Sequence, residues 1–200
     1  MFEEKNTFAE KMIELREKKK QEQEMIISDN DIENGFVVIN QKVYEVEEMK
    51  LVERKFAMFM PSEFGQLDES LVESKYPNIL RPKYIYSDKT TRVNITFMID
   101  DKTIDSEDVE ELKENLICLL TDLHPEYEII EEEIIQANDS SIATFGFTKA
   151  TLDGELYQMF FITSLKEKLL IGGFNCNAQV KDEWYPVIHQ MIHTIRPIND

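Results

Sequence analysis

The chain has 200 residues, of which 42% are apolar, so it is long and apolar enough to bury a substantial core and is not expected to be disordered. Forty acidic residues against 22 basic ones give a formal net charge of −18, which disfavours nucleic acid and anionic membranes as partners and suits a basic protein segment. Two separated cysteines, Cys118 and Cys176, make no disulfide framework and indicate a reducing, cytoplasmic location, and the start Met-Phe-Glu-Glu-Lys lacks the apolar stretch of a secretory signal.

The charge is unevenly distributed along the chain. Residues 99–136 hold 14 acidic and 2 basic residues, a net of −12, whereas residues 75–92 hold 5 basic residues and 1 acidic residue, a net of +4. Such an asymmetry can orient a charged partner. The longest apolar runs are far too short to cross a bilayer, so no membrane partner is expected.

The N-terminal part is predicted to form a helix and a linker. Phe8, Met12 and Leu15 share one face of a helix that we expect over residues 7–24, and a polar stretch follows it. The sequence therefore predicts two parts, an N-terminal helix and linker over residues 1–34 and an antiparallel-sheet domain over residues 35–200.

Short β-branched and aromatic runs, bounded by polar residues or proline, predict the strands of this domain. They cover residues 36–39, 43–46, 55–60, 84–87, 92–99, 127–135, 141–152, 155–163 and 168–176. A short helix is expected within residues 67–76, and two longer amphipathic helices begin after Asp105 and near Lys181. Their apolar stripes are Val109, Leu112, Leu116, Leu119, Leu120 and Leu123 in the first and Trp184, Val187, Ile188, Met191, Ile192 and Ile195 in the second.

The last three strands can be placed in register from their turns. A two-residue turn at Asp153-Gly154 sets Phe147 opposite Phe160, and a second turn at Lys166-Glu167 sets Phe161 opposite Gly172. One face then carries Phe145, Phe147, Phe160, Ile162, Leu169 and Ile171, and the other carries Ile142, Tyr157, Met159, Phe161, Leu170, Phe174 and Cys176. On this second face the Phe161 ring is expected to cover Gly146 and Gly172.

Both faces of these strands are apolar, so both must be covered. The expected fold class is α+β, with a single antiparallel sheet flanked by helices on both faces (an αβα sandwich) and an N-terminal helical extension.

The element order and four apolar motifs resemble the PsbP-like fold family, over roughly residues 36–196. The motifs are Phe56-Ala-Met-Phe-Met-Pro61, Asn94-Ile-Thr-Phe97, Ala143-Thr-Phe-Gly-Phe147 and Leu170-Ile-Gly-Gly-Phe174, with the closing helix from Trp184 to Ile195. This family includes the photosystem subunit PsbP, a nuclear-transport factor that binds the GTPase Ran, bacterial DcrB-like proteins and secretion chaperones. The resemblance implies a non-catalytic, protein-binding role, and it transfers no functional residue to this sequence.

The candidate chemistry of individual residues points away from catalysis. His189 and His193 have a spacing that can share a metal, but no third ligand lies nearby and both are expected on the solvated face of their helix. Cys176 has no base beside it in the sequence, so we interpret it as a packed thiol, and Cys118 as an exposed one. No metal, no cofactor and no catalytic residue is predicted.

Two surfaces are candidates for partner binding. The first is the second sheet face, at Tyr157, Met159, Phe161 and Phe174, which is either core beneath a helix or a groove for an apolar segment of a partner. The second is a surface loop that interleaves basic and aromatic residues, with Tyr76, Arg81 and Tyr84. Given the net charge, an acidic protein patch suits this loop better than nucleic acid does.

The leading hypothesis for function is a non-enzymatic, cytoplasmic protein-binding or chaperone-like module that contacts a basic or apolar segment through a sheet face or a sheet edge. The alternative is a small-ligand sensor or enzyme with a pocket at the sheet–helix junction near Tyr157 and Cys176. A third possibility is self-association through the N-terminal helix, and the sequence does not fix the oligomeric state.

Overall fold

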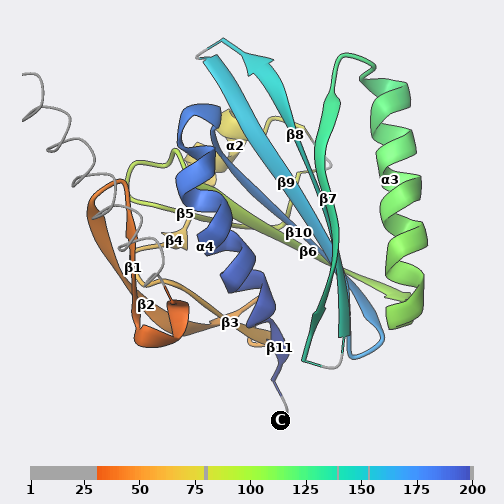
Figure 1. Ribbon diagram of the computed structural model, residues 1–200, viewed down its shortest axis with the longest axis horizontal. Coiled ribbons are helices and arrows are strands. Elements are labelled where there is room, and N and C mark those ends of the chain that lie inside the picture. The colour runs from red at the N-terminus through yellow and green to blue at the C-terminus, as the bar shows by residue number, and fades with distance from the viewer. Residues whose placement is uncertain (1–30, 79–80, 139, 153, 199–200) are drawn as a thin grey trace, which may run out of the picture.

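The computed structural model describes residues 31–78, 81–138, 140–152 and 154–198. These residues form two antiparallel sheets and three α-helices (Figure 1). The larger sheet has the strand order β4-β5-β6-β10-β9-β8-β7, with β4 (Gly65–Gln66), β5 (Tyr84–Ser87), β6 (Asn94–Thr103), β7 (Glu128–Ala137), β8 (Ser140–Thr151), β9 (Gly154–Leu165) and β10 (Lys168–Asn177). The smaller sheet has the order β1-β2-β3-β11, with β1 (Phe36–Ile39), β2 (Lys42–Leu51), β3 (Phe56–Pro61) and β11 (Arg196–Pro197). The helices are α2 (Glu69–Lys75), α3 (Val109–Leu123) and α4 (Lys181–His193), and the short 3-10 helices are η1 (Ile32–Asn34), η2 (Ser106–Asp108) and η3 (Ala178–Val180).

The α+β class is confirmed, but the prediction of a single sheet is wrong. The first three strands form their own sheet, which β11 completes by pairing with β3. Alternation along a strand shows which face is apolar but not which strand lies beside it, so the sequence did not reveal the division. The helix predicted over residues 7–24 lies outside the described residues. The end of the predicted linker is packed, because Ile32 in η1 is 3% exposed and its N–H donates to Gln190 Oε1 at 2.8 Å.

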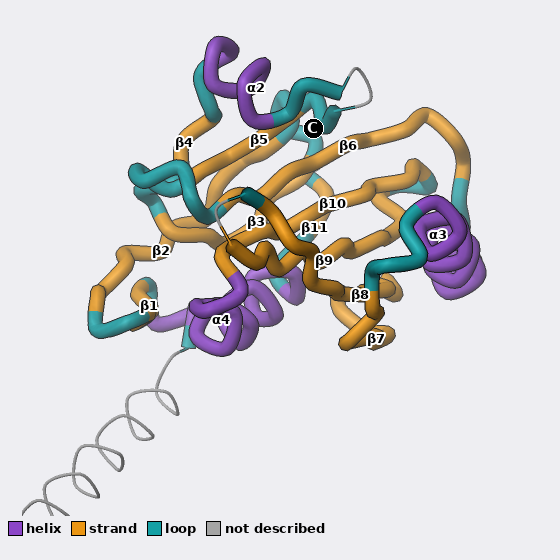
Figure 2. Tube along the Cα trace, turned by 90° about the horizontal axis from the view of Figure 1, so that it is seen from above, coloured by secondary structure: helices purple, strands orange, loops and turns teal. Residues whose placement is uncertain are grey.

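The main core lies between the two sheets and α4. The larger sheet contributes the face that carries Tyr157, Phe161 and Phe174, and the smaller sheet contributes Phe56 and Met58. The predicted apolar stripe of α4 is confirmed, because all six of its residues are buried in this core. Figure 2 shows α4 beside the smaller sheet, away from α3.

A second core lies between the other face of the larger sheet and α3. Phe145, Phe147 and Ile162 belong to it, as the sequence predicts. The stripe predicted for α3 is partly wrong, because Leu119 is 55% and Leu123 67% exposed. The helix turns Ile117 toward the sheet instead, and it buries Lys113, whose ammonium pairs with Glu132 of β7 at 3.0 Å. Two leucines of the predicted stripe thus lie on the surface.

The predicted register is right at one turn and displaced by two residues at the other. Phe161 pairs with Gly172, as the turn at Lys166-Glu167 requires. Between β8 and β9, however, Thr151 pairs with Gly154, so Phe160 lies opposite Phe145 rather than Phe147. Gly154 has the expected positive φ of 122°, but it is the first residue of β9 and not the second residue of the turn. A shift of two residues leaves every side chain on its predicted face.

Two strand glycines make room for aromatic rings of the main core. A Cβ on Gly172 would lie 1.9 Å from Phe161 Cζ, so this ring covers the glycine as predicted. The displaced register brings a different ring to Gly146, where a Cβ would lie 2.8 Å from Tyr157 Oη. The prediction that Phe161 covers Gly146 is therefore wrong, and Tyr157 takes that place.

Candidate functional site

The four residues predicted as a partner-binding face lie in the interior. Tyr157, Phe161 and Phe174 are 0% exposed and Met159 is 1% exposed. The Phe174 ring lies 6.0 Å from the ring of Trp184 in α4, so the helix covers this part of the face. Of the two alternatives that the sequence leaves open, the burial of all four residues favours core beneath a helix.

A polar cluster joins the sheet to the start of α4 at the junction proposed for a ligand pocket. The Tyr157 hydroxyl donates to Glu131 Oε2 at 2.5 Å, and the ammonium of Lys181 pairs with the other oxygen of the same carboxylate. The ammonium also lies 5.2 Å from the centroid of the Tyr157 ring. Burial, and then the hydrogen bond to Glu131, raise the pKa of Tyr157, so the phenol remains protonated and acts as a donor.

The thiol beside this cluster is not set up as a nucleophile. Cys176 is 0% exposed, and burial raises its pKa to about 12, although the charge of Lys181 acts in the opposite direction. Because the thiolate is the reactive form, the thiol is inert near neutral pH. The polar groups here bind one another, and their arrangement ties β7 and β9 to α4.

The two histidines of α4 face a carboxylate of β7. His189 Nε2 lies 2.8 Å from Glu133 Oε2, and the His189 and His193 rings lie 5.0 Å apart. Burial, and then His189, lower the pKa of His193. No three metal-binding side chains come together within the part of the chain that the structure describes.

In the same part, no helix is long and apolar enough to span a membrane.

The residues of the predicted basic-aromatic loop do not form one surface. The Tyr76 hydroxyl accepts a hydrogen bond from Asn175 Nδ2 of β10 at 3.2 Å. The Tyr84 hydroxyl donates to Glu53, between β2 and β3, at 2.6 Å. Arg81 donates its backbone N–H to Asn78. The two tyrosines thus contact different parts of the molecule, because Tyr84 lies in β5 and Tyr76 ends α2.

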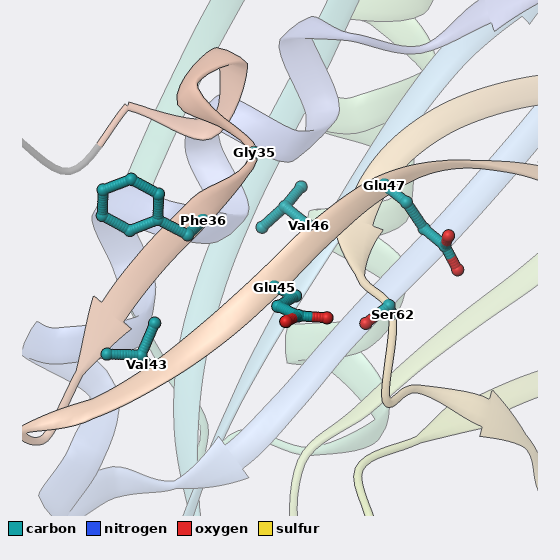
Figure 3. Close-up of a pocket in the computed structure, with 7 residues that line it drawn as sticks. All are labelled: Gly35, Phe36, Val43, Glu45, Val46, Glu47 and Ser62. Atoms are coloured by element: carbon teal, nitrogen blue, oxygen red, sulfur yellow. The ribbon is translucent and has the colours of Figure 1, made fainter.

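A shallow hollow of about 490 Å³ lies on the smaller sheet, and the sequence did not predict it (Figure 3). Phe36 of β1 and Val43 of β2 are 44% and 62% exposed there. The pairs Phe36–Glu45 and Val38–Val43 place these side chains on one face of the β1–β2 hairpin. We call this hollow the β1–β2 groove; it is lined by Gly35, Phe36, Val43, Glu45, Val46, Glu47 and Ser62. In the sequence, Val43 lies between Lys42 and Tyr44 and resembles an ordinary strand residue, so no signal in the sequence indicated this hollow.

The β1–β2 groove is acidic as well as apolar. Figure 3 shows the carboxylates of Glu45 and Glu47 on the side of the groove near Ser62, away from Phe36. Neither carboxylate forms an ion pair within the described residues, whereas the nearby Lys42 pairs with Glu63 at 2.6 Å. The groove therefore combines two exposed apolar side chains with two carboxylates that have no cationic partner there.

Comparisons with known proteins identify the fold. No protein-family profile and no curated protein sequence matches the chain. Among solved structures, cyanobacterial PsbP (CyanoP) from Synechocystis sp. PCC 6803 is similar, with a TM-score of 0.56, 11% identity, and coverage of 80% of this chain and 96% of that chain. A protein from Bacteroides thetaiotaomicron has a TM-score of 0.49 at 10% identity, over 77% of this chain and 49% of that one. LpqN, which is involved in cell envelope biogenesis of Mycobacterium tuberculosis, has a TM-score of 0.45 at 13% identity, over 76% of this chain and 92% of that one. The chain has the PsbP-like fold.

Proposed function

We propose that this chain is a non-enzymatic protein-binding module whose β1–β2 groove holds an apolar segment of a partner that also carries lysine or arginine. One observation supports this function best. Phe36 and Val43 are exposed on the same face of a short hairpin, and Glu45 and Glu47 line the same hollow. Single exposed apolar residues are common on protein surfaces, but here two of them occur together with a hollow and two carboxylates.

The chemistry of the groove defines the partner. Complete burial of a valine or phenylalanine side chain contributes about 1.5–3 kcal/mol, and both residues still have exposed area to lose. Carboxylates without cationic partners favour a lysine or arginine placed beside the apolar anchor. The net charge of −18 accelerates encounter with basic segments and disfavours association of identical copies.

Exposed apolar side chains beside carboxylates also fit a chaperone-like role, which is part of this proposal. The implied location is the cytoplasm, because the exposed Cys118 and the buried Cys176 are both free thiols and suit a reducing compartment.

The alternative of a ligand pocket near Tyr157 and Cys176 has less support, because both side chains are fully buried and the Tyr157 ring fills the space above Gly146.

Isothermal titration calorimetry with designed peptides tests the proposed function. The panel contains a peptide with a leucine–phenylalanine anchor flanked by lysines and the same peptide with glutamates in place of the lysines. We expect binding of the lysine peptide only, and Val43→Thr should weaken it about fivefold, since the loss of about 1 kcal/mol of apolar contact corresponds to that factor.

The control is Leu152→Thr, which changes a fully exposed apolar residue between β8 and β9 and should leave the affinity unchanged. Equal binding of the two peptides, or no effect of Val43→Thr, would contradict the proposal. A metabolite that raises the melting temperature and shifts the NMR signals of Tyr157 would instead favour the ligand-pocket alternative.

A further inference from the structure

A second interaction surface lies at the free edge of the larger sheet, on β7. This strand pairs with β8 on one side only, and Figure 2 shows it as the outermost strand of the row β6, β10, β9, β8, β7. Within the described residues, no backbone hydrogen bond joins β7 to any element other than β8. An edge strand leaves alternate N–H and C=O groups without partners, and these groups can pair with another chain.

β7 differs from the other edge strands in length. It has 10 residues, whereas β4 and β11 have two each and β1 has four. Short edge strands offer little to a pairing partner. The pairing of β7 with β8 shifts between Ile129 and Glu131, and Ile130, at this irregularity, is 42% exposed. Regular pairing then runs from Glu131 to Ala137, which is long enough to template a strand of ordinary length.

Carboxylates line both faces of this edge. Glu131 and Glu133 point toward α4, where they meet Lys181 and His189. Glu132 points toward α3, where it meets Lys113. These contacts fix the carboxylates in place along the strand, and each carboxylate retains further acceptor positions.

The charge pattern selects between possible occupants. A second copy of this chain would bring a net charge of −18 and its own glutamates to the same edge, and this like charge disfavours the association of two copies there. A strand with lysine or arginine at successive positions would meet carboxylates on both of its faces. We propose that β7, from Glu131 to Ala137, accepts an extended basic segment of a partner protein as an eighth strand of the larger sheet.

The test uses the full chain and two peptides with the same side chains. One is a peptide with three successive lysines flanked by valines, and the other has every second backbone amide N-methylated, so that it keeps the charge but cannot complete the ladder. Amide hydrogen exchange is followed by NMR. With the first peptide, the outward amides between Glu131 and Ala137 exchange at least about tenfold more slowly, and with the methylated peptide they do not change.

Three results would overturn the proposal: equal protection by both peptides, protection confined to residues outside β7, or no protection at about 1 mM peptide. The β1–β2 groove belongs to the other sheet, so the same experiment with Val43→Thr separates the two surfaces. Protection of β7 in that variant supports the edge site whatever the fate of the groove, and loss of that protection would contradict an independent site.

Discussion

The hydroxyl of Tyr157, on the interior strand β9, reaches Glu131 Oε2, on the edge strand β7, at a distance of 2.5 Å. The intervening strand β8 permits this contact because Gly146 has no side chain to block it. Glu131 also pairs with Lys181, so one carboxylate links the edge of the larger sheet to α4. This link stabilises the strand that we propose as a binding edge.

Replacement of Tyr157 by phenylalanine should destabilise the protein. The change leaves Glu131 with Lys181 but without the buried phenol donor, and loss of such a partner costs about 1–3 kcal/mol. Urea denaturation measures the free energy of unfolding. Tyr84→Phe is the matched control, since it removes a hydroxyl that donates to Glu53 at the surface, and its cost should be smaller. Equal costs would contradict the role given to the Tyr157–Glu131 bond.

Replacement of Gly172 by alanine should also destabilise the fold. The new Cβ would lie 1.9 Å from Phe161 Cζ, so the ring must move within a packed core, at a cost of about 1–3 kcal/mol or more. Gly65→Ala is the control, because nothing lies within 4 Å of its Cβ position. The double variant with Phe161→Leu should recover part of the lost stability, and thermal unfolding compares all four proteins. No difference between the two glycine variants would contradict the packing described here.

The two thiols should differ in reactivity. Cys118 is exposed and should react with a thiol reagent in the folded protein, whereas Cys176 should react only after unfolding. The folded pKa of Cys176, about 12, lies above the ordinary 9.0, so the folded state keeps its proton longer than the unfolded state. This contribution to stability is complete below pH 9 and is lost as the pH rises from 9 toward 12. Cys176→Ala should therefore flatten the decline of stability in that range, and an unchanged decline would contradict the assignment.

His193 should make the protein less stable in mild acid. Burial and the neighbouring His189 lower its pKa below 6.5, while Glu133 acts in the opposite direction. Between the folded and the ordinary pKa, the unfolded state binds more protons, so stability falls as the pH drops below 6.5. The effect is small because the ring is near the surface. Urea midpoints at pH 7.5 and pH 5.5, about one unit either side of the ordinary histidine pKa, should differ less in His193→Gln than in the parent protein.

Much of the fold could be predicted because alternation and helical periodicity depend on local sequence. The residues on both faces of β8, β9 and β10 were assigned correctly, since a two-residue error at Gly154 preserves the parity of each strand. Strand partners depend on contacts distant in the sequence, so the second sheet and its closing strand β11 could not be found in this way. The phase of α3 was wrong at Leu119 and Leu123 because apolar character alone does not fix which flank a helix turns to the sheet.

The candidate site was harder to predict than the fold. The sequence predicts that Tyr157 and Phe174 lie on an apolar sheet face, but it does not show that α4 and a second sheet both cover this face. The β1–β2 groove escaped prediction because Phe36 and Val43 look like ordinary strand residues until their exposure is known. Whether side chains such as Phe36 and Val43 stay exposed depends on which other elements pack over them, and this is decided by the whole fold.

The most direct test of the central claim is the affinity of the lysine-flanked apolar peptide for the double variant Glu45→Gln with Glu47→Gln. The control is Glu110→Gln with Glu111→Gln in α3, which changes the net charge equally at exposed positions on the other side of the larger sheet. We expect the groove variant to weaken binding about tenfold and the α3 variant to leave it nearly unchanged. Equal weakening by both variants would show that the general field of the protein, and not the β1–β2 groove, holds the peptide.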